Sequence, residues 1–196
     1  MRIALLGGAF DPPHHGHALC VNKLLESKLI DEVWITPSGE RVDKRYCVEP
    51  HHRRKMATLF VESLNDPRIK FFPIQIDELL PGSYTIDLIR YLNKEYVQHE
   101  FFVIIGTELV RDIPRWKEAE ALLKEASFLV ITRPSEVAPK LMGRMTILPD
   151  PEQRLSSLSS TAIRERLRRG ELDANALAPD VAEYIRAHGL YADKKE

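Results

Sequence analysis

Short apolar runs alternate with helical patterns along most of this 196-residue chain, and this alternation restricts the fold more than any other feature. Residues 101–106 and 128–132 are apolar runs with almost no polar interruption. Strands of this kind are typical of a parallel sheet that helices cover on both faces. The expected fold is therefore α/β, with a doubly wound, Rossmann-like parallel sheet and a short C-terminal helical segment.

The same patterns predict the individual elements. We expect strands over residues 3–6, 32–36, 69–76, 101–106, 128–132 and 145–148. Helices are expected over residues 15–29, 50–64, 84–96 with Ser83 as the cap, in two short pieces around Trp116, and over 161–169 and 179–188. The length suits a single domain over residues 1–196, with a Rossmann-like core at 1–150 and a C-terminal helical part at 151–196.

Composition restricts the partners. The formal net charge is -1 and no basic face is evident, so we expect no nucleic acid partner. No apolar stretch is as long as a membrane span, and the first apolar run is too short for a signal peptide, so we expect no membrane partner. Cys20 and Cys47 are too few for a disulfide framework, which favours reduced thiols in a cytoplasmic protein. A homo-oligomer is compatible with the sequence.

The first candidate site is the segment from Gly7 to His17. Gly7 and Gly8 end the first strand and let a ligand approach the backbone, while the next helix directs its N–H groups and positive dipole end at the same space. His14 and His17 share a face if both lie in the first helical turn, which gives a pocket of donors suited to phosphate. The alternative is a plain turn with surface histidines. A zinc site at His14, His15 and His17 lacks an acidic or cysteine partner, so we expect no protein-bound metal.

The second candidate site begins with Ser159 and Ser160. Serines before a helix are ordinary caps, and that is one interpretation. A capping box, however, needs Glu or Gln three residues later, where Ala162 and Ile163 stand. The other interpretation is therefore that the hydroxyls and first-turn N–H groups meet an anion, with Arg164 one turn further on.

These segments resemble known signatures. The string from Gly8 to His17 resembles the first signature of the nucleotidyltransferase superfamily with a histidine-x-glycine-histidine motif, and residues 159–164 resemble the second. Together with residues 83–87, 104–108 and 181–191, they make the chain similar to bacterial nicotinate mononucleotide adenylyltransferases nearly end to end. The resemblance implies transfer of AMP from ATP to a pyridine mononucleotide, with Mg²⁺ bound mainly through ATP phosphates and water.

The resemblance also implies roles for individual residues. His14 and His17 would hold ATP phosphates and stabilise the charge that grows at the α-phosphorus, and Arg164 would complete the catalytic set. The implied ATP-binding residues are Gly8, Ala9, Phe10, His14, His17, Gly106, Glu108, Ser159, Ser160, Thr161 and Arg164. The implied mononucleotide-binding residues are Lys44, Tyr84, Thr85, Trp116 and Arg133, with the Trp116 indole as a stacking face for the pyridine ring.

The chain departs from the family's pattern after the second strand. Family members commonly carry Pro-Pro-His-Lys there, and this chain has a different stretch in which Lys44, or alternatively Arg41, takes the lysine's role. The other interpretation is that Lys44 and Arg41 are charged loop residues exposed to solvent. Glu108 stands where the family often has Asp, which puts its contact with a ribose hydroxyl in question. Arg133 either meets a phosphate or is an exposed arginine.

Two further expectations concern charged residues near these motifs. Asp11 either contacts waters on Mg²⁺ or braces its loop, and we favour bracing. The basic run at residues 51–55 is expected to be the exposed start of a helix.

Alternatives to the implied reaction stay open. Nicotinamide mononucleotide, or both pyridine mononucleotides, could be the acceptor, and relatives in the superfamily use phosphopantetheine or choline-type phosphates. A non-catalytic nucleotide-binding sensor could have the same fold, although the presence of both His14 and His17 favours an enzyme.

Overall fold

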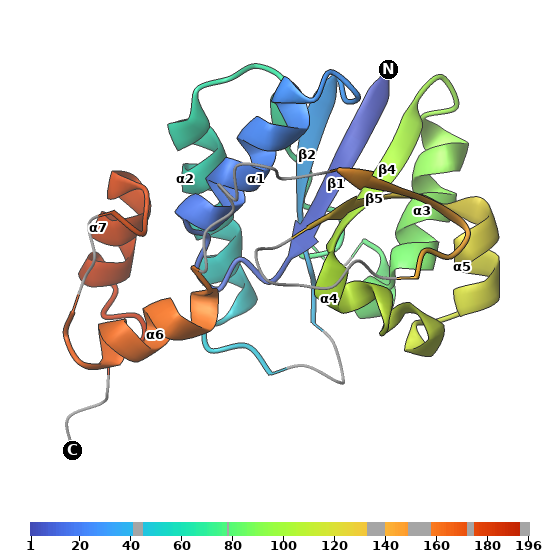
Figure 1. Cartoon of the computed structure of the whole chain (residues 1–196). Coiled ribbons are helices and arrows are strands. Elements are labelled where there is room, and N and C mark those ends of the chain that lie inside the picture. The colour runs from blue at the N-terminus through green and yellow to red at the C-terminus, as the bar shows by residue number, and fades with distance from the viewer. Residues whose placement is uncertain (41–44, 78, 133–139, 149–157, 172–174, 193–196) are drawn as a thin grey trace.

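The computed structural model describes residues 1–40, 45–77, 79–132, 140–148, 158–171 and 175–192. Its strands form one parallel sheet in the order β3-β2-β1-β4-β5-β6 (Figure 1). The strands are β1 (Arg2–Gly8), β2 (Glu32–Pro37), β3 (Ile69–Phe71), β4 (Glu100–Gly106), β5 (Ser127–Ile131) and β6 (Arg144–Leu148). This is the strand order of the doubly wound Rossmann fold, so the predicted fold class is confirmed.

Helices cover both faces of the sheet. Figure 1 shows α1, α2 and α7 on one side of it and α3 and α5 on the other. The helices are α1 (His15–Glu26), α2 (Pro50–Leu64), α3 (Thr85–Glu95), α4 (Thr107–Val110), α5 (Ala119–Glu125), α6 (Ser160–Arg168) and α7 (Pro179–Ala187), with short 3-10 turns η1 (Pro81–Ser83) and η2 (Ile113–Arg115). Each helix in the described ranges is too short or too polar to cross a membrane.

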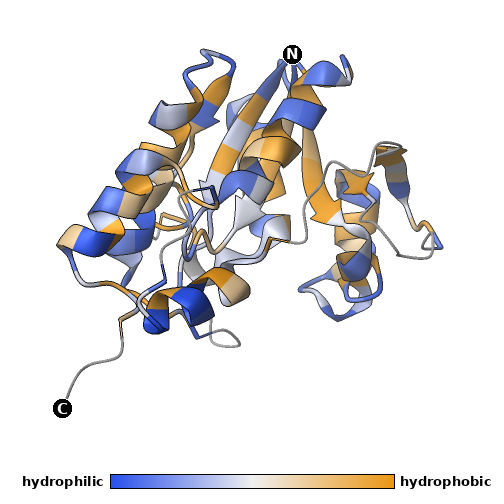
Figure 2. Cartoon of the chain, turned by 60° about the vertical axis from the view of Figure 1, so that its left-hand side comes forward, coloured by the Kyte–Doolittle hydropathy of each residue, from blue (hydrophilic) through white to orange (hydrophobic). Residues whose placement is uncertain are grey.

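Alternation along β1 creates two hydrophobic cores. Ala4 and Leu6 pack in the core that contains the buried faces of α1, α2 and α7. Ile3 and Leu5 point to the opposite face and pack with α3 and α5. Successive side chains of a strand point to opposite faces, so a strand buried on both sides must be apolar throughout. Figure 2 shows the strands as largely hydrophobic, while hydrophilic residues lie on the outer surfaces of the helices.

Two predicted boundaries differ from the structure for local reasons. β3 ends at Phe71 and does not reach Ile76, because Pro73 has no N–H to donate to the neighbouring strand. Ser83 does not cap α3, since Tyr84 occupies the cap position. The Ser83 hydroxyl instead accepts a hydrogen bond from the Gly39 N–H at 2.9 Å, which ties the start of α3 to the loop after β2.

A cluster of aromatic side chains joins α2 to α7. His52 Nδ1 lies 2.9 Å from the Tyr184 hydroxyl oxygen, and the rings of His51 and His188 lie 4.0 Å and 5.5 Å from the His52 ring. Burial lowers the pKa of His52 below its usual value of 6.5, and the positive charges of His51 and His188 lower it further, against an opposing effect of Glu49. The packing of α7 on α2 therefore favours a neutral His52.

This cluster predicts that the protein loses stability in mild acid. Below pH 6.5 the unfolded chain binds a proton at His52 before the folded chain does, so the free energy of unfolding should fall as pH decreases through the lowered folded-state pKa. His52→Gln should flatten that part of the profile, as measured by denaturant unfolding at a series of pH values. The control Lys55→Gln removes a charge from the same helix but no imidazole, and should keep the wild-type slope. An unchanged slope in His52→Gln would contradict the assignment.

Candidate active site

Two cavities meet at the carboxyl ends of β1 and β4. The first has a volume of about 290 Å³ and is lined by the N-terminal turns of α1 and α6 and by the start of α4. The second has a volume of about 590 Å³ and extends toward α3 and η2. Gly7, Ile104 and Ile105 line both cavities. β1 and β4 are neighbours at which the strand order reverses, and this is where ligands bind in doubly wound sheets.

His14 and His17 form a reciprocal cap at the start of α1. His14 Nδ1 accepts a hydrogen bond from the Gly16 N–H at 3.1 Å, and His17 Nδ1 accepts one from the His14 N–H at 3.1 Å. A neutral imidazole that accepts at Nδ1 carries its proton on Nε2, so the backbone selects the same tautomer in both rings. The ring centroids are 3.9 Å apart, and both residues line the first cavity. The two rings therefore supply a pair of Nε2–H donors at a helix N-terminus, as the sequence predicted in outline.

Phe10 packs behind this pair. Its side chain is 1% exposed, and its ring centroid lies 4.9 Å from that of His17 and 6.4 Å from that of Phe60 on α2. Phe10 has a φ of 49°, a left-handed conformation that bulky residues rarely adopt. The loop is thus bent at Phe10 so that an aromatic ring, not solvent, supports the His17 imidazole.

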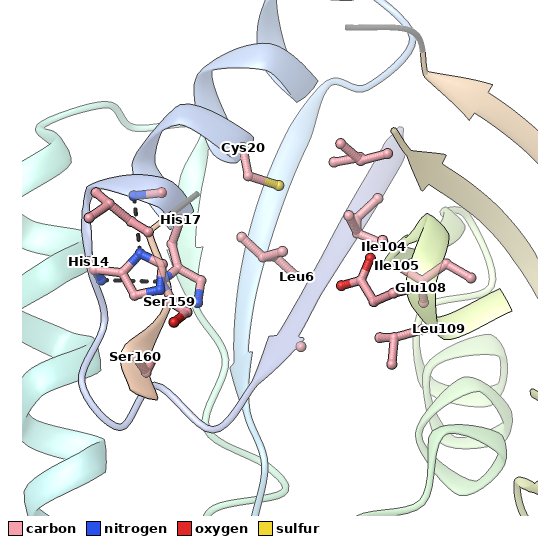
Figure 3. Close-up of a pocket in the computed structure, with 15 residues that line it drawn as sticks. Leu6, His14, His17, Cys20, Ile104, Ile105, Glu108, Leu109, Ser159 and Ser160 are labelled. Carbon is pink, nitrogen blue, oxygen red and sulfur yellow. Dashed lines mark hydrogen bonds between the residues drawn. The ribbon is translucent and has the colours of Figure 1, made fainter. Parts of the chain in front are cut away.

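Helix α6 docks on the same loop through its two leading serines. The Ser159 hydroxyl accepts a hydrogen bond from the Ala162 N–H at 3.2 Å, as an ordinary N-cap does. The Ser160 hydroxyl donates to the Pro12 carbonyl at 2.9 Å. The interpretation of these serines as ordinary caps is therefore confirmed for Ser159, and the Ser160 hydroxyl has a partner in the Pro12 carbonyl. Both residues still line the first cavity, and Figure 3 shows them beside His14 and His17.

Arg164 and Tyr191 hold the loop at Asp11. Arg164 donates to the Asp11 carbonyl at 2.7 Å and to the Thr161 hydroxyl at 3.2 Å. The Asp11 carboxylate, 3% exposed, accepts from the Tyr191 hydroxyl and from the Cys47 N–H, both at 2.8 Å. Burial, together with the charge of Asp11, raises the pKa of Tyr191, so Tyr191 remains a donor. The expectation that Asp11 braces its loop is confirmed.

The opposite wall of the first cavity comes from β4 and α4. Gly106 ends β4, and Glu108 lies in the first turn of α4, across the cavity from the two histidines (Figure 3). A Cβ atom at Gly106 would collide with the Glu108 carboxylate, so the absence of a side chain lets that carboxylate fold over the strand end. Leu6 and Leu109 add apolar surface to the same cavity. This wall combines a carboxylate acceptor with surface suited to a flat ring.

The second cavity brings together three residues that the sequence predicted to share a site. Tyr84, Thr85 and Trp116 all line it, although Trp116 lies 31 residues after Thr85 in the chain. Arg115 and Lys117 line it too, and neither was predicted from the sequence. The Lys117 ammonium pairs with Asp87 at 2.9 Å and lies 4.8 Å from the Tyr84 ring centroid.

Arg53 corrects the prediction for the basic run at residues 51–55. Its side chain is fully buried, and its guanidinium donates to the carbonyls of Ala9 and Ser38. The spacing could have revealed this, since Arg53 stands three and seven residues before Met56 and Phe60, on the buried face of α2. Arginine is seldom fully buried, which is why a basic run suggested an exposed one. The predicted contacts of Lys44, its alternative Arg41, and Arg133 lie outside the described residues.

Comparisons with known proteins agree with this geometry. Residues 5–166 match the family model described as cytidylyltransferase-like. A "Probable nicotinate-nucleotide adenylyltransferase" of Leifsonia xyli is 33% identical over 198 residues, which cover 97% of this chain and 94% of the relative. A protein of the same name from Tropheryma whipplei is 34% identical over 188 residues, covering 95% and 97%. The chain belongs to the nicotinate-nucleotide adenylyltransferase family.

Solved structures place the same fold in this family. The structure titled Plasmodium falciparum nicotinic acid mononucleotide adenylyltransferase complexed with NaAD has a TM-score of 0.77 at 27% identity, and the match covers 97% of both chains. The same protein complexed with APC has a TM-score of 0.77 at 25% identity. The family resemblance found in the sequence is therefore confirmed.

The contacts at Asp11 predict a stability effect of one hydroxyl. Tyr191→Phe leaves a buried carboxylate oxygen without its donor, so the free energy of unfolding should fall by about 1–3 kcal/mol in denaturant titration. Tyr91→Phe is the matched control, because the Tyr91 hydroxyl has no hydrogen bond within the described part of the chain. Equal stability of the two variants would show that the Tyr191 contact contributes nothing.

Proposed function

We propose that this protein transfers AMP from ATP to nicotinate mononucleotide, giving deamido-NAD and pyrophosphate. The observation that carries the proposal is that two cavities meet at the end of β1, one with the His14 and His17 donors and one with Trp116 and Thr85. A reaction that joins two nucleotides needs two adjacent sites whose phosphates meet. The family and the neighbour solved with NaAD support the identity of the product.

The proposed chemistry is an in-line displacement at the α-phosphorus. A phosphate oxygen of the mononucleotide forms the new bond, and the bond from the α-phosphorus to the bridging oxygen breaks. The nucleophile is already an anion, so no general base is required, and the protein contributes positioning and electrostatics. The Nε2–H groups of His14 and His17 donate to the oxygens on which charge grows. The backbone of Gly8, Ala9 and Phe10 lies alongside the α-phosphate.

Pyrophosphate is proposed to leave toward α6. The first-turn N–H groups at Ser160 and Thr161, together with the positive dipole end of this nine-residue helix, suit the β- and γ-phosphates. Arg164 contributes its charge from the position where it holds the Asp11 carbonyl. Because α6 and Tyr191 complete the site, we propose that residues 1–196 form a single domain.

The base and the pyridine are proposed to lie on opposite faces of the sheet, at the carboxyl ends of β1 and β4. Adenosine would lie against Gly106, with a ribose hydroxyl donating to Glu108. The pyridine ring would stack on Trp116 beside Tyr84 and Thr85. Arg115 and Lys117 also line this cavity, and each has a carboxylate partner, Asp112 at 3.6 Å and Asp87 at 2.9 Å. The proposed preference for nicotinate over nicotinamide mononucleotide therefore rests on the family and on the neighbour solved with NaAD.

Mg²⁺ is proposed to bind through the ATP phosphates and water. Asp11, the carboxylate nearest the histidine motif in sequence, already accepts from Tyr191 and Cys47. In the described ranges, no group of three or more His, Cys, Asp or Glu could hold a metal ion. Bound to the triphosphate, Mg²⁺ would neutralise part of the charge on the leaving group. Neither Cys20 nor Cys47 forms a disulfide, which is compatible with the cytoplasmic location that we also propose.

Two substitutions at His17 distinguish the role of its Nδ1 atom in capping α1 from the role of its Nε2–H group in catalysis. His17→Asn keeps an acceptor near the Nδ1 position, so α1 stays capped, but removes the Nε2–H donor. Turnover should then fall by about 10²–10³-fold without loss of fold. His17→Gln places an amide near the Nε2 position and should retain more activity than His17→Asn. A folded His17→Asn variant with wild-type turnover would show that His17 does not stabilise the reacting phosphate.

Pyrophosphate release tests the reaction itself. Wild-type protein with ATP and Mg²⁺ should release pyrophosphate fastest with nicotinate mononucleotide, more slowly with nicotinamide mononucleotide, and not with phosphopantetheine or phosphocholine. EDTA should abolish the release. Binding of ATP without release across all acceptors would favour a nucleotide sensor, and an equal or higher rate with nicotinamide mononucleotide would overturn the proposed acceptor.

A further inference from the structure

We propose that Arg53 is a positioning residue for adenylyl transfer, which fixes the two loops that carry the reacting phosphates. The inference rests on the proposed function. Arg53 lies on α2, outside both proposed phosphate motifs, in a basic run that the sequence predicted to be exposed.

The guanidinium is buried among backbone acceptors. It is fully buried and donates to the Ser38 carbonyl at 2.7 Å and to the Ala9 carbonyl at 3.2 Å. Its carboxylate partner is Glu40, at 3.3 Å, and that side chain is 54% exposed. The Tyr46 ring covers it, with the guanidinium carbon 3.8 Å from the ring centroid. Arg53 Nε is a buried donor that has no hydrogen-bond partner among the residues that the structure describes.

Burial of the Arg53 charge lowers the stability of the fold unless other interactions offset it. Removing a guanidinium from water carries a large desolvation cost, and neutral carbonyls offset it less well than a buried carboxylate would. A stable anchor for two loops could be built from apolar side chains or a neutral amide. The retention of a full positive charge beside a site for two polyanions therefore points to function and not only to folding.

The contacts of Arg53 join the loop after β1 to the loop after β2. Ala9 belongs to the first loop and Ser38 to the second, and both line the second cavity. The Ser38 N–H and hydroxyl also donate to the Gly8 carbonyl, at 2.8 Å and 3.2 Å. One guanidinium thus bridges the two loops from behind, while Ser38 links them at the cavity.

Because the peptide group is planar, the hydrogen bonds of Arg53 to the two carbonyls also fix the directions of the N–H groups of the following residues. In a trans peptide the C=O and N–H point in opposite directions, so a carbonyl turned toward Arg53 turns the next N–H away from it. For the Ser38 carbonyl, that N–H belongs to Gly39 and meets the Ser83 hydroxyl at 2.9 Å. For the Ala9 carbonyl, it belongs to Phe10, within the loop proposed to lie along the α-phosphate. Arg53 therefore sets the direction of a proposed phosphate donor without touching substrate.

A comparison of two adjacent arginines tests the role. Arg53 Nη1 donates to both carbonyls while Nη2 donates to Glu40. Arg53→Lys keeps the charge but has a single nitrogen on an unbranched stem, so it cannot reproduce all three contacts in the same geometry, and Arg53→Met removes the charge. Arg54→Met is the matched control, because Arg54 stands next in the same helix, is half exposed and pairs with Asp77 at 2.8 Å. Pyrophosphate release would be followed at varied ATP and varied nicotinate mononucleotide, with thermal unfolding of each variant as the measure of folding.

The expected result is a loss in kcat larger than any change in KM. For Arg53→Lys, kcat should fall by about 10²-fold, the effect of misplacing reacting groups by about 1 Å. Its KM for ATP should stay within about threefold of wild type, because the lost interaction acts on the transition state. Arg53→Met should lose at least as much, and Arg54→Met should match wild type.

Each outcome separates this inference from the proposed function. If wild-type protein releases no pyrophosphate with any acceptor, the proposed function fails before Arg53 is tested. If wild type is active and folded Arg53→Lys turns over at the wild-type rate, Arg53 is a structural anchor only and the inference is overturned. The same conclusion follows if Arg53→Lys raises KM alone. Should Arg53→Met fail to fold, the kcat of Arg53→Lys decides.

Discussion

Asp11 is the point at which three distant parts of the chain meet. Its carboxylate accepts from Tyr191 near the C-terminus and from the Cys47 N–H before α2, and its carbonyl accepts from Arg164 on α6. These contacts join segments that are up to 180 residues apart. The loop that follows β1 has no regular structure of its own, so its shape depends on this set of hydrogen bonds. The positions of His14 and His17 follow from the shape of that loop.

The sheet then determines what this loop can reach. β1 and β4 are neighbours at the reversal of the strand order, so their carboxyl ends leave space on both sides of one strand end. Ile104 and Ile105 are consecutive on β4, and both border the two cavities. The end of β4 is apolar and lies between the two cavities, which are therefore only one strand apart. That arrangement suits a reaction between two ligands better than the binding of one.

The sequence predicted the parts of this architecture that depend on local pattern. Continuous apolar strands require helices on both faces, and the Gly7–His17 string predicted a loop that places two histidines at a helix N-terminus. The sequence could not predict how α6 docks. From residue type alone, Ser159 and Ser160 could equally cap the helix, bond to Pro12 or bind an anion. Nor could it place Arg53, since burial of a cation depends on carbonyls from two other loops. Long-range hydrogen bonds decide both cases, and residue types in one segment do not encode them.

The electrostatics of the site also follow from these long-range contacts. The chain has a formal net charge of -1, yet the proposed reaction must bring two phosphate-bearing ligands together. The potential that favours this has to be local. The N-termini of α1 and α6 point at the first cavity, and Arg53 lies behind the two loops at the edge of the second. Asp11, the buried carboxylate of the loop, accepts hydrogen bonds from two donors, so it would oppose phosphates in the proposed site less than an unpaired carboxylate would. Helix ends and a buried guanidinium can therefore gather anions in one pocket while the molecule as a whole stays nearly neutral.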